Sequence, residues 1–387
     1  MTVRVPDLTI QELHLPKSME DADGGEFREL CAVLDAVALG TWGNLDRASS
    51  ARARLAAWQD TPYWSSRNFV ARSGGGIVGH ASCEFPLKDN VDAAWLCVDV
   101  LEEYRGQGIG TALLRMAEEA SLKQGRHVLQ AETADPRGAP GRDLLQPATG
   151  IGGVPKDGPG TIFCLKNGYS LEQASRFSVL DLGRAAGKST PGESAPARSA
   201  PDGSAPDAGH PDWDSLEQAA RSKPADYDVL TWANRCPEEY VDQMAVLMGR
   251  MSTDTPAGGL EIEAEVWDAA RVRQREETVL DGGQHALVAA ARHRQTGELC
   301  AYTVLYLDPD EPWLAEQDDT LVAAPHRGKR LGMLVKLANL RSLLAGYAAV
   351  ERVMTFNAEE NDHMLAINVQ LGFRAAGYDG EWQKRIK

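Results

Sequence analysis

The chain contains the same short glycine- and arginine-rich turn twice, each copy standing between a predicted strand and a predicted helix. The copies read YRGQGIG at Tyr104–Gly110 and HRGKRLG at His326–Gly332. Short apolar runs precede them at 94–100 and 314–322, and segments with helical spacing follow them. Such a turn directs backbone N–H groups outward at a helix N-terminus, where the helix dipole favours negative charge. The repetition predicts two related domains, each with a phosphate-binding turn.

A long segment without large apolar residues divides the chain. Gly183–Asp212 lacks Val, Ile, Leu, Met, Cys, Phe, Trp and Tyr, and consists mainly of Ala, Pro, Gly, Ser and scattered charge. Such a segment cannot bury enough apolar surface to offset the entropy of ordering it. At 387 residues the chain is also too long for one ordinary core. We expect an N-terminal domain at 1–182, a flexible linker at 183–212 and a C-terminal domain at 213–387, each folding without the other.

Both halves show the same order of predicted elements. A strand, two helices and two strands precede the strand–turn–helix unit, and a further strand, a helix and a strand pair follow it. A helix that crosses over between two neighbouring strands makes them parallel, whereas short connections make them antiparallel. The order predicts an α+β (mixed α/β) fold of two similar domains, each a mostly antiparallel sheet flanked by helices with one parallel strand pair.

Charge and composition narrow the classes of function. A formal net charge of −16 argues against general nucleic-acid binding, which needs a basic surface. The charge is compatible with a cationic substrate, although solubility alone explains it equally well. No apolar run approaches the ~20 residues of a membrane helix. The six cysteines form no C-x-x-C pair, so we expect no metal site, no disulfide scaffold and a cytoplasmic protein.

The two turns resemble the signature of the GNAT superfamily, the acetyl-CoA-dependent N-acetyltransferases, in its tandem two-domain form. The signature is Arg/Gln-x-x-Gly-x-Gly/Ala between a strand and a helix. Arg105 and the glycines that follow it match fully, whereas the second copy has Arg330 where the family usually has a glycine. A second signature, Asn followed by Gly-Phe, is similar to Asn361 and Gly372-Phe373. In the first half only Gly168-Tyr169 remains of it.

The resemblance implies acetyl-CoA as the co-substrate, with its pyrophosphate held by backbone amides of the turns. The backbones of Val100 and Val322 match the position that pairs with the pantetheine arm. The cofactor-binding residues implied in the first half are Val100, Arg105, Gly106, Gly108, Ile109 and Gly110. Those implied in the second half are Val322, Arg327, Gly328, Arg330, Leu331, Gly332 and Asn361.

The resemblance places a general base on the strand before the turn, nine or eleven residues ahead of the motif arginine. In the second half these positions hold Asp318 and Glu316, and in the first half they hold Leu96 and Ala94, which cannot move a proton. Glu316 and Asp318 alternate with Gln317, so we expect them to share one strand face with Thr320 and Val322. A solvated strand start is the alternative explanation for both carboxylates.

The tyrosine that usually serves as general acid is missing from both halves. Cys164 stands at its position in the first half and Asn368 in the second. A cysteine between apolar neighbours is more often a core residue, and Asn368 can donate a hydrogen bond but no useful proton. The pair of carboxylates therefore favours the second half as the catalytic domain, with Glu316, Asp318 and Asn368 as its catalytic residues. The more complete glycine turn favours the first half.

The same reasoning predicts where an acceptor would lie in the second half. The loop Ser252–Gly259 follows the first predicted helix, and Glu261, Glu263 and Glu265 come after it. Acidic side chains at this position would suit an amine. Glu263 is equally consistent with stabilising a helix that we expect at 263–278.

The sequence thus favours an acyltransferase, an acetyl-CoA-dependent N-acetyltransferase acting on a primary amine of a small molecule. We expect a CoA thioester and a small amine as its partners, no nucleic acid or membrane, and a monomer or homodimer. A catalytically silent acyl-CoA-binding or sensing protein and a protein-lysine acetyltransferase remain alternatives. The pattern of residues does not identify the acceptor.

Overall fold

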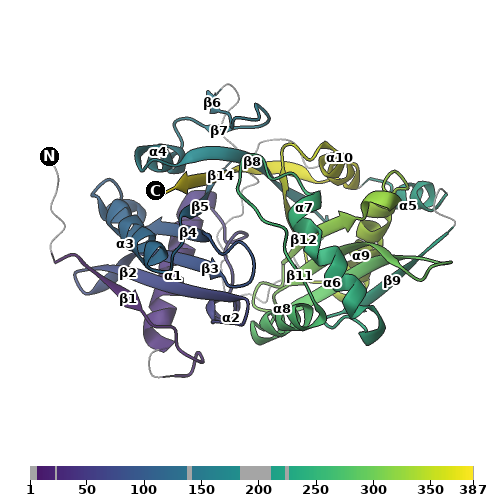
Figure 1. Ribbon diagram of the computed structural model, residues 1–387, viewed down its shortest axis with the longest axis horizontal. Coiled ribbons are helices and arrows are strands. Elements are labelled where there is room, and N and C mark those ends of the chain that lie inside the picture. The colour runs from purple at the N-terminus through teal and green to yellow at the C-terminus, as the bar shows by residue number, and fades with distance from the viewer. Residues whose placement is uncertain (1–6, 22–23, 137–141, 184–210, 223–225, 387) are drawn as a thin grey trace, which may run out of the picture. The chain divides into compact units, whose positions relative to one another are not determined.

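The computed structural model describes residues 7–21, 24–136, 142–183, 211–222 and 226–386, and most of the predicted linker, 184–210, lies outside this part. The chain forms two compact units (Figure 1). Unit 1 comprises Met1–Ala174, Ala257–Glu263 and Tyr378–Lys387. Unit 2 comprises Ser175–Pro256 and Ala264–Gly377.

These units do not coincide with the consecutive segments 1–182 and 213–387 expected from the sequence. Strand β8 (Ser170–Asp181) begins in unit 1 and its later residues belong to unit 2. Strand β14 (Arg374–Arg385) begins in unit 2 and its later residues belong to unit 1. Alternation along a segment identifies a strand and its faces, but it does not identify the neighbour with which the strand pairs. The sequence therefore predicted the two closing strands, β8 and β14, but not the strands with which they pair.

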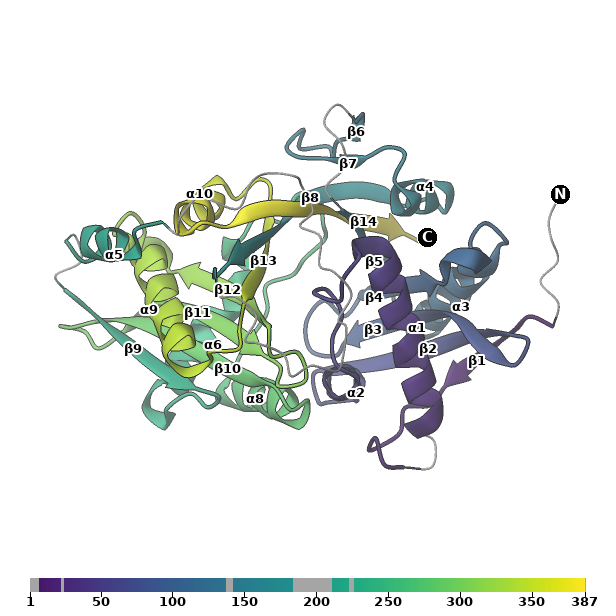
Figure 2. The same ribbon diagram turned by 180° about the vertical axis from the view of Figure 1, so that it is seen from behind.

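Unit 1 is a sheet with helices on both faces (Figure 2). The strands lie in the order β1-β2-β3-β4-β5-β14-β8, and β4 and β5 are its parallel pair. Its elements are β1 (Thr9–Leu13), α1 (Gly24–Trp42), α2 (Ala51–Trp58), β2 (Trp64–Ser73), β3 (Gly76–Pro86), β4 (Ala93–Val100), α3 (Ile109–Lys123), β5 (Val128–Pro136), the short hairpin β6 (Leu144–Leu145) and β7 (Val154–Pro155), and α4 (Pro159–Lys166).

Unit 2 repeats this plan. Its strands lie in the order β8-β13-β12-β11-β10-β9, and β12 and β13 form the parallel pair. Its elements are α5 (Trp213–Arg221), β9 (Tyr227–Ala233), α6 (Val241–Gly249), α7 (Met251–Asp254), α8 (Ala269–Asp281), β10 (His285–His293), β11 (Leu299–Leu307), β12 (Leu314–Val322), α9 (Leu331–Gly346), β13 (Arg352–Ala358) and α10 (Asp362–Leu371). The prediction of a mixed α/β fold with mostly antiparallel sheets is confirmed. No helix in the described ranges is long and apolar enough to span a membrane.

In each unit the parallel pair is joined over only part of its length. β4 pairs with β5 over Ala93–Leu96, and β12 pairs with β13 over Leu314–Gln317. Beyond these residues each strand continues without pairing with its parallel neighbour. The unpaired ends, Cys97–Val100 and Asp318–Val322, lead directly into the two turns. This split brings strand backbone and turn together in both units.

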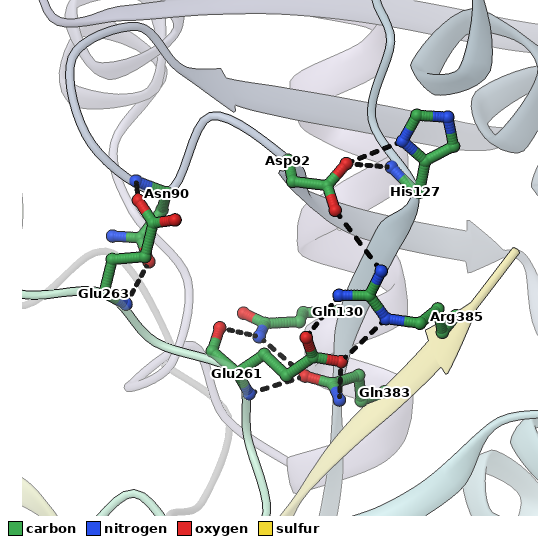
Figure 3. Close-up of polar contacts among 8 residues, drawn as sticks. All are labelled: Asn90, Asp92, His127, Gln130, Glu261, Glu263, Gln383 and Arg385. Carbon is green, nitrogen blue, oxygen red and sulfur yellow. Dashed lines mark hydrogen bonds and ion pairs between the residues drawn. The ribbon is translucent and has the colours of Figure 1, made fainter.

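A polar network ties the segment 257–263 and the end of β14 into unit 1 (Figure 3). The Gln383 side chain accepts from the Gln130 side chain at 3.0 Å and from the Glu261 backbone N–H at 2.8 Å. The Asn90 side chain accepts from the Glu263 backbone N–H at 2.7 Å, and the Glu263 side chain accepts from the Asn90 backbone N–H at 2.8 Å. Arg385 adds ion pairs to Glu261 and Asp92.

This network corrects the acceptor loop expected from the sequence. Glu261 and Glu263 belong to unit 1 and hold backbone and side chains there, so they do not line a site of the second half. Glu263 is also not at a helix N-terminus, because α8 begins at Ala269 with Asp268 as its N-cap. The sequence pattern gave the helix but placed its start too early.

Candidate functional site

The turn of unit 1 is held by its arginine. Arg105 Nε donates to the Val100 carbonyl at 2.9 Å and so fixes the turn against the end of β4. Gly106 and Gly108 have φ of 74° and 88°, and Gly108 is the N-cap of α3. The first amides of a helix have no partner inside it. The turn therefore presents backbone N–H groups and the positive end of α3 at the split of the sheet, which suits an anionic ligand.

The turn of unit 2 follows the same path with a different residue. Arg327 Nε donates to the Val322 carbonyl at 3.1 Å, and Gly328 has φ of 76°. Arg330 takes the N-cap position of α9 with φ of 59°, a conformation that is uncommon outside glycine. The backbone cradle is therefore preserved although the glycine is not.

The last glycine of each turn permits a close approach of three elements. A Cβ on Gly110 would lie 3.3 Å from the Phe163 ring and 3.6 Å from Val100. A Cβ on Gly332 would lie 3.2 Å from Ile367 and 3.6 Å from Val322. The helix after each turn thus packs equally tightly against its strand and against the following helix.

Three further residues predicted to bind the cofactor use their side chains elsewhere in the fold. Ile109 and Leu331 are buried in the cores, so only their backbone could face a ligand. Asn361 caps α10 by accepting from the Met364 N–H at 3.2 Å. The sequence assigned it to the cofactor, and its side-chain oxygen serves the helix.

Polar side chains gather behind the turn of unit 2. Tyr227 Oη lies 2.7 Å from His326 Nδ1 and accepts from Lys329 Nζ at 2.8 Å. Within the described ranges, Glu298, Cys300 and His326 are the one set of three metal-ligating side chains whose ligand atoms lie within 4.8 Å of one another. The turn of unit 2 therefore has a tyrosine, a histidine and a lysine in contact beside it.

The carboxylates predicted in unit 2 lie on β12, but Asp318 has a cationic partner. Arg275 of α8 pairs with Asp318 at 2.6 Å and donates to Tyr306 Oη at 3.0 Å. Tyr306 is also the register partner of Glu316. Asp318 therefore already has a cationic partner within the protein.

A β-bulge changes which residues accompany these carboxylates. Thr303 pairs with Thr320, yet Leu305 pairs with Gln317, so β12 has one extra residue between them. The Thr320 hydroxyl bonds to Thr303 Oγ1, which also accepts from the Gln317 side chain. Thr320 therefore lies with Gln317 and not with Asp318. The expected shared face was wrong, because a bulge shifts the alternation by one residue.

The bulge also brings a second aspartate to the α8 side. Asp319 Oδ2 accepts from Tyr302 Oη at 2.9 Å. Burial and the neighbouring Asp318 raise the pKa of Asp319 to about 6. Strict alternation would have directed this side chain to the opposite face, so Asp319 could not be selected from the pattern alone.

Asn368 is used by the interior of unit 2. It is buried, accepts from Lys336 Nζ at 3.0 Å and donates to Asn357 Oδ1 at 2.6 Å. Lys336 is itself fully buried on α9, and burial lowers its pKa to about 7. Asn368 therefore has a structural explanation that does not require a catalytic role. Cys164, at the matching position of unit 1, is buried and its pKa is raised to about 12 by burial.

We expect Lys336 to make stability rise with pH above neutrality. The unfolded chain keeps a proton on this amine up to its ordinary pKa of ~10.4, whereas the folded pKa is about 7. The unfolded state binds more protons between these values, so the free energy of unfolding rises by up to about 1.4 kcal/mol per pH unit. Urea titrations across this window should show a flatter rise for Lys336→Met. An equally steep rise in the variant would contradict this explanation.

The sheet of unit 1 has one apolar face and one polar face. The side chains packed with α3 are apolar and include those of Cys83, Phe85, Ala94, Leu96 and Leu129. Alternation turns the intervening residues to the opposite face. We call six of these the acidic face: Glu84, Cys97, Asp99, Glu132, Asp379 and Glu381.

Glu84 is the carboxylate of this face best suited to accept a proton near neutral pH. Its side chain is partly exposed, yet the protein surrounds it closely enough that desolvation raises its pKa to about 7. Desolvation also raises the pKa of Asp99, whose Oδ2 lies 3.2 Å from Cys97 Sγ. Glu84 was not predicted from the sequence. Polar residues at every second position, His80, Ser82 and Glu84, nevertheless indicate a polar strand face.

Comparison with known proteins agrees with this geometry. Residues 40–146 match the model of the acetyltransferase (GNAT) family. A tandem GNAT protein from the clavulanic acid biosynthesis pathway shares the fold with a TM-score of 0.70 and 24% identity, covering 98% of each chain. A GCN5-related N-acetyltransferase from Sphaerobacter thermophilus has a TM-score of 0.59 and 12% identity, covering 99% of this chain and 97% of its own.

A third structure, a putative acetyltransferase from Pyrococcus horikoshii, has a TM-score of 0.51 and 11% identity, covering 100% of this chain and 92% of its own. No curated protein sequence matches the chain significantly. Residues 40–146 are thus similar to the acetyltransferase (GNAT) family, and the chain as a whole has the fold of a tandem GNAT protein.

Proposed function

We propose that the protein is an acetyl-CoA-dependent N-acetyltransferase that acetylates a primary amine of a small molecule, and that the chemistry takes place in unit 1. The observation that carries this proposal is the position of Glu84. It lies on the strand next to β4, on the acidic face, with a pKa of about 7. The same β4 leads past the split into the complete glycine turn.

The sequence favoured unit 2 as the catalytic unit, but the contacts of two residues there weigh against this assignment. Asp318 is paired with Arg275, and Asn368 is bonded to Lys336 and Asn357. The face of unit 2 that carries Asp318 is also filled near α6 by an apolar cluster that includes Met244, Val304 and Leu321. We therefore propose that unit 2 keeps the turn of a CoA-binding domain but does not catalyse acetyl transfer.

The reaction needs few groups from the protein. Amides of the turn, with Arg105 holding it against Val100, would bind the pyrophosphate of acetyl-CoA. Glu84 would take a proton from the acceptor ammonium. The amine nitrogen then attacks the acetyl carbonyl carbon and gives its second proton to solvent, the C–S bond breaks, and CoA leaves as the thiolate, which takes a proton from solvent. Backbone N–H groups of β4 beyond the split could stabilise the oxyanion that forms in between.

Calorimetry and thiol release test the proposal together. We expect the protein to bind acetyl-CoA and to release CoA thiol when an amine panel is added, faster than without amines. Binding without amine-dependent thiol release would indicate the silent acyl-CoA-binding alternative. No binding at millimolar acetyl-CoA would overturn both.

A matched pair of variants assigns the reaction to a unit. Gly108→Asp and Arg330→Asp place a carboxylate at the same position of the two turns, and aspartate tolerates positive φ better than most residues. A negative charge there opposes pyrophosphate binding. We expect Gly108→Asp to raise the KM for acetyl-CoA by about 10-fold or more, and Arg330→Asp to leave it nearly unchanged. The reverse pattern would place the reaction in unit 2.

A further inference from the structure

Two carboxylates of the acidic face come from the last strand of unit 1. Along β14, Trp382 faces α3, where it is fully buried and donates to Thr133 Oγ1 at 2.9 Å. Asp379 and Glu381 alternate with Trp382 and therefore project from the other side of the strand, onto the acidic face. Asp379 is 1% exposed, so its carboxylate is held inside the protein.

One oxygen of Asp379 has no partner. Oδ1 accepts from Arg47 at 2.5 Å, but Oδ2 is buried and has no hydrogen bond to any described residue. Buried carboxylate oxygens are normally hydrogen-bonded, because leaving one unpaired carries the cost of removing it from water. This atom therefore marks a place where a donor is expected.

The charges around Asp379 do not balance. Arg47 bonds to both Asp379 and Glu132, and it is the cation that approaches them in the described part of unit 1. Glu381 lies close enough to Glu132 and Asp379 that both act on its titration. Burial first, and the neighbouring Glu132 second, raise the pKa of Asp379 to about 7, and the same causes raise the pKa of Glu381 well above its ordinary value. The carboxyl groups of Glu132, Asp379 and Glu381 therefore either keep protons or bind a second cation.

This excess of negative charge lies away from Glu84 but on the same face of the sheet. The strand order β3-β4-β5-β14 puts three strand spacings of ~4.8 Å between the strand of Glu84 and that of Asp379. Glu84 is level with Trp95, Gln130 and Gln383, and Asp379 lies four residues further along β14, so the two carboxyl groups are roughly 20 Å apart. The split between β4 and β5 lies between the two strands. A molecule along this face would meet the proton acceptor at one end and the carboxylate surplus at the other.

We propose that the acceptor of unit 1 is a dication, whose reacting amine lies at Glu84 and whose second cationic group binds Asp379 Oδ2 and Glu381. The inference rests on the proposed function and names its substrate class. A protonated amine or guanidinium would donate to Asp379 Oδ2 and complete the charge balance that Arg47 leaves open. The spacing of the two groups suits a linear diamine or an amine with a distant guanidinium.

A series of linear α,ω-diaminoalkanes, each compared with the alkylamine of equal length, tests the proposal. We expect kcat/KM for thiol release to favour the diamine by about 10-fold or more at the best length. In Glu381→Gln this preference should shrink through a higher KM for diamines. Asp157→Asn, which changes an exposed carboxylate of unit 1 outside the acidic face, should keep it. Equal use of both amine series would overturn the dication and leave the acetyltransferase standing.

Direct binding provides a readout that does not need turnover. Calorimetric titration of the best diamine at pH 7, in buffers of different ionisation enthalpy, should show net proton release, because a bound cation favours the ionised forms of Asp379 and Glu381. Release should fall in Glu381→Gln. Binding without proton release, or release that Glu381→Gln and Asp379→Asn leave unchanged, would overturn the proposal even if no amine is acetylated.

Discussion

Replacing Glu84 by glutamine is expected to lower turnover by about 10²–10⁴-fold while leaving the affinity for acetyl-CoA unchanged. Glutamine keeps the shape and hydrogen bonding of the side chain but cannot accept the ammonium proton. The wild-type rate should rise with pH through about 7, because below this pKa the Glu84 carboxyl is protonated and cannot act as a base. The variant should lose that rise. Steady-state thiol release between pH 6 and 9, with calorimetry for acetyl-CoA, would measure both effects.

The matched controls are the carboxylates of unit 2. Asp318→Asn and Glu316→Gln should keep most of the activity, since Asp318 is already paired with Arg275. Should Asp318→Asn abolish turnover while Glu84→Gln retains it, the chemistry lies in unit 2 as the sequence suggested. Asp319, with its pKa of about 6, would then be the next residue to replace.

Replacing Trp382 by alanine is expected to destabilise unit 1 by about 3–5 kcal/mol, the usual cost of truncating a large buried aromatic side chain. Trp382 is fully buried among the residues that pack with α3, and its indole N–H bonds to Thr133. Chemical denaturation monitored by circular dichroism would give the change. Arg385→Ala on the same strand removes exposed ion pairs and should cost about 1 kcal/mol or less. Equal effects of the two variants would contradict the assignment of β14 to the core of unit 1.

The same contacts reverse the expectation that the halves fold separately. A fragment of residues 1–182 lacks the end of β14 and the segment 257–263, which belong to unit 1. It would leave β5 without its β14 neighbour and Arg47 without Asp379. We expect this fragment to aggregate or remain unfolded.

Local patterns predicted most of the fold and the two turns. The turns at Arg105 and Arg327 could be recognised because their chemistry depends on neighbouring residues of the chain. The destination of β14 could not, because strand pairing is set by contacts between distant segments. The bulge at Asp318 and Asp319 could not be predicted either, because it is defined by the register of β12 with β11. Glu84 could not be selected from the sequence, because the acidic face is formed by four strands and only β4 precedes the turn.

The division of β14 between the units also has a consequence for how the protein is made. Residues 378–386 are synthesised after all of unit 2, yet they complete the sheet of unit 1. During translation the N-terminal half must therefore wait with the edge of β5 open, and an open strand edge is a template for wrong pairing. Unit 1 therefore becomes native only after residues 378–386 have been synthesised.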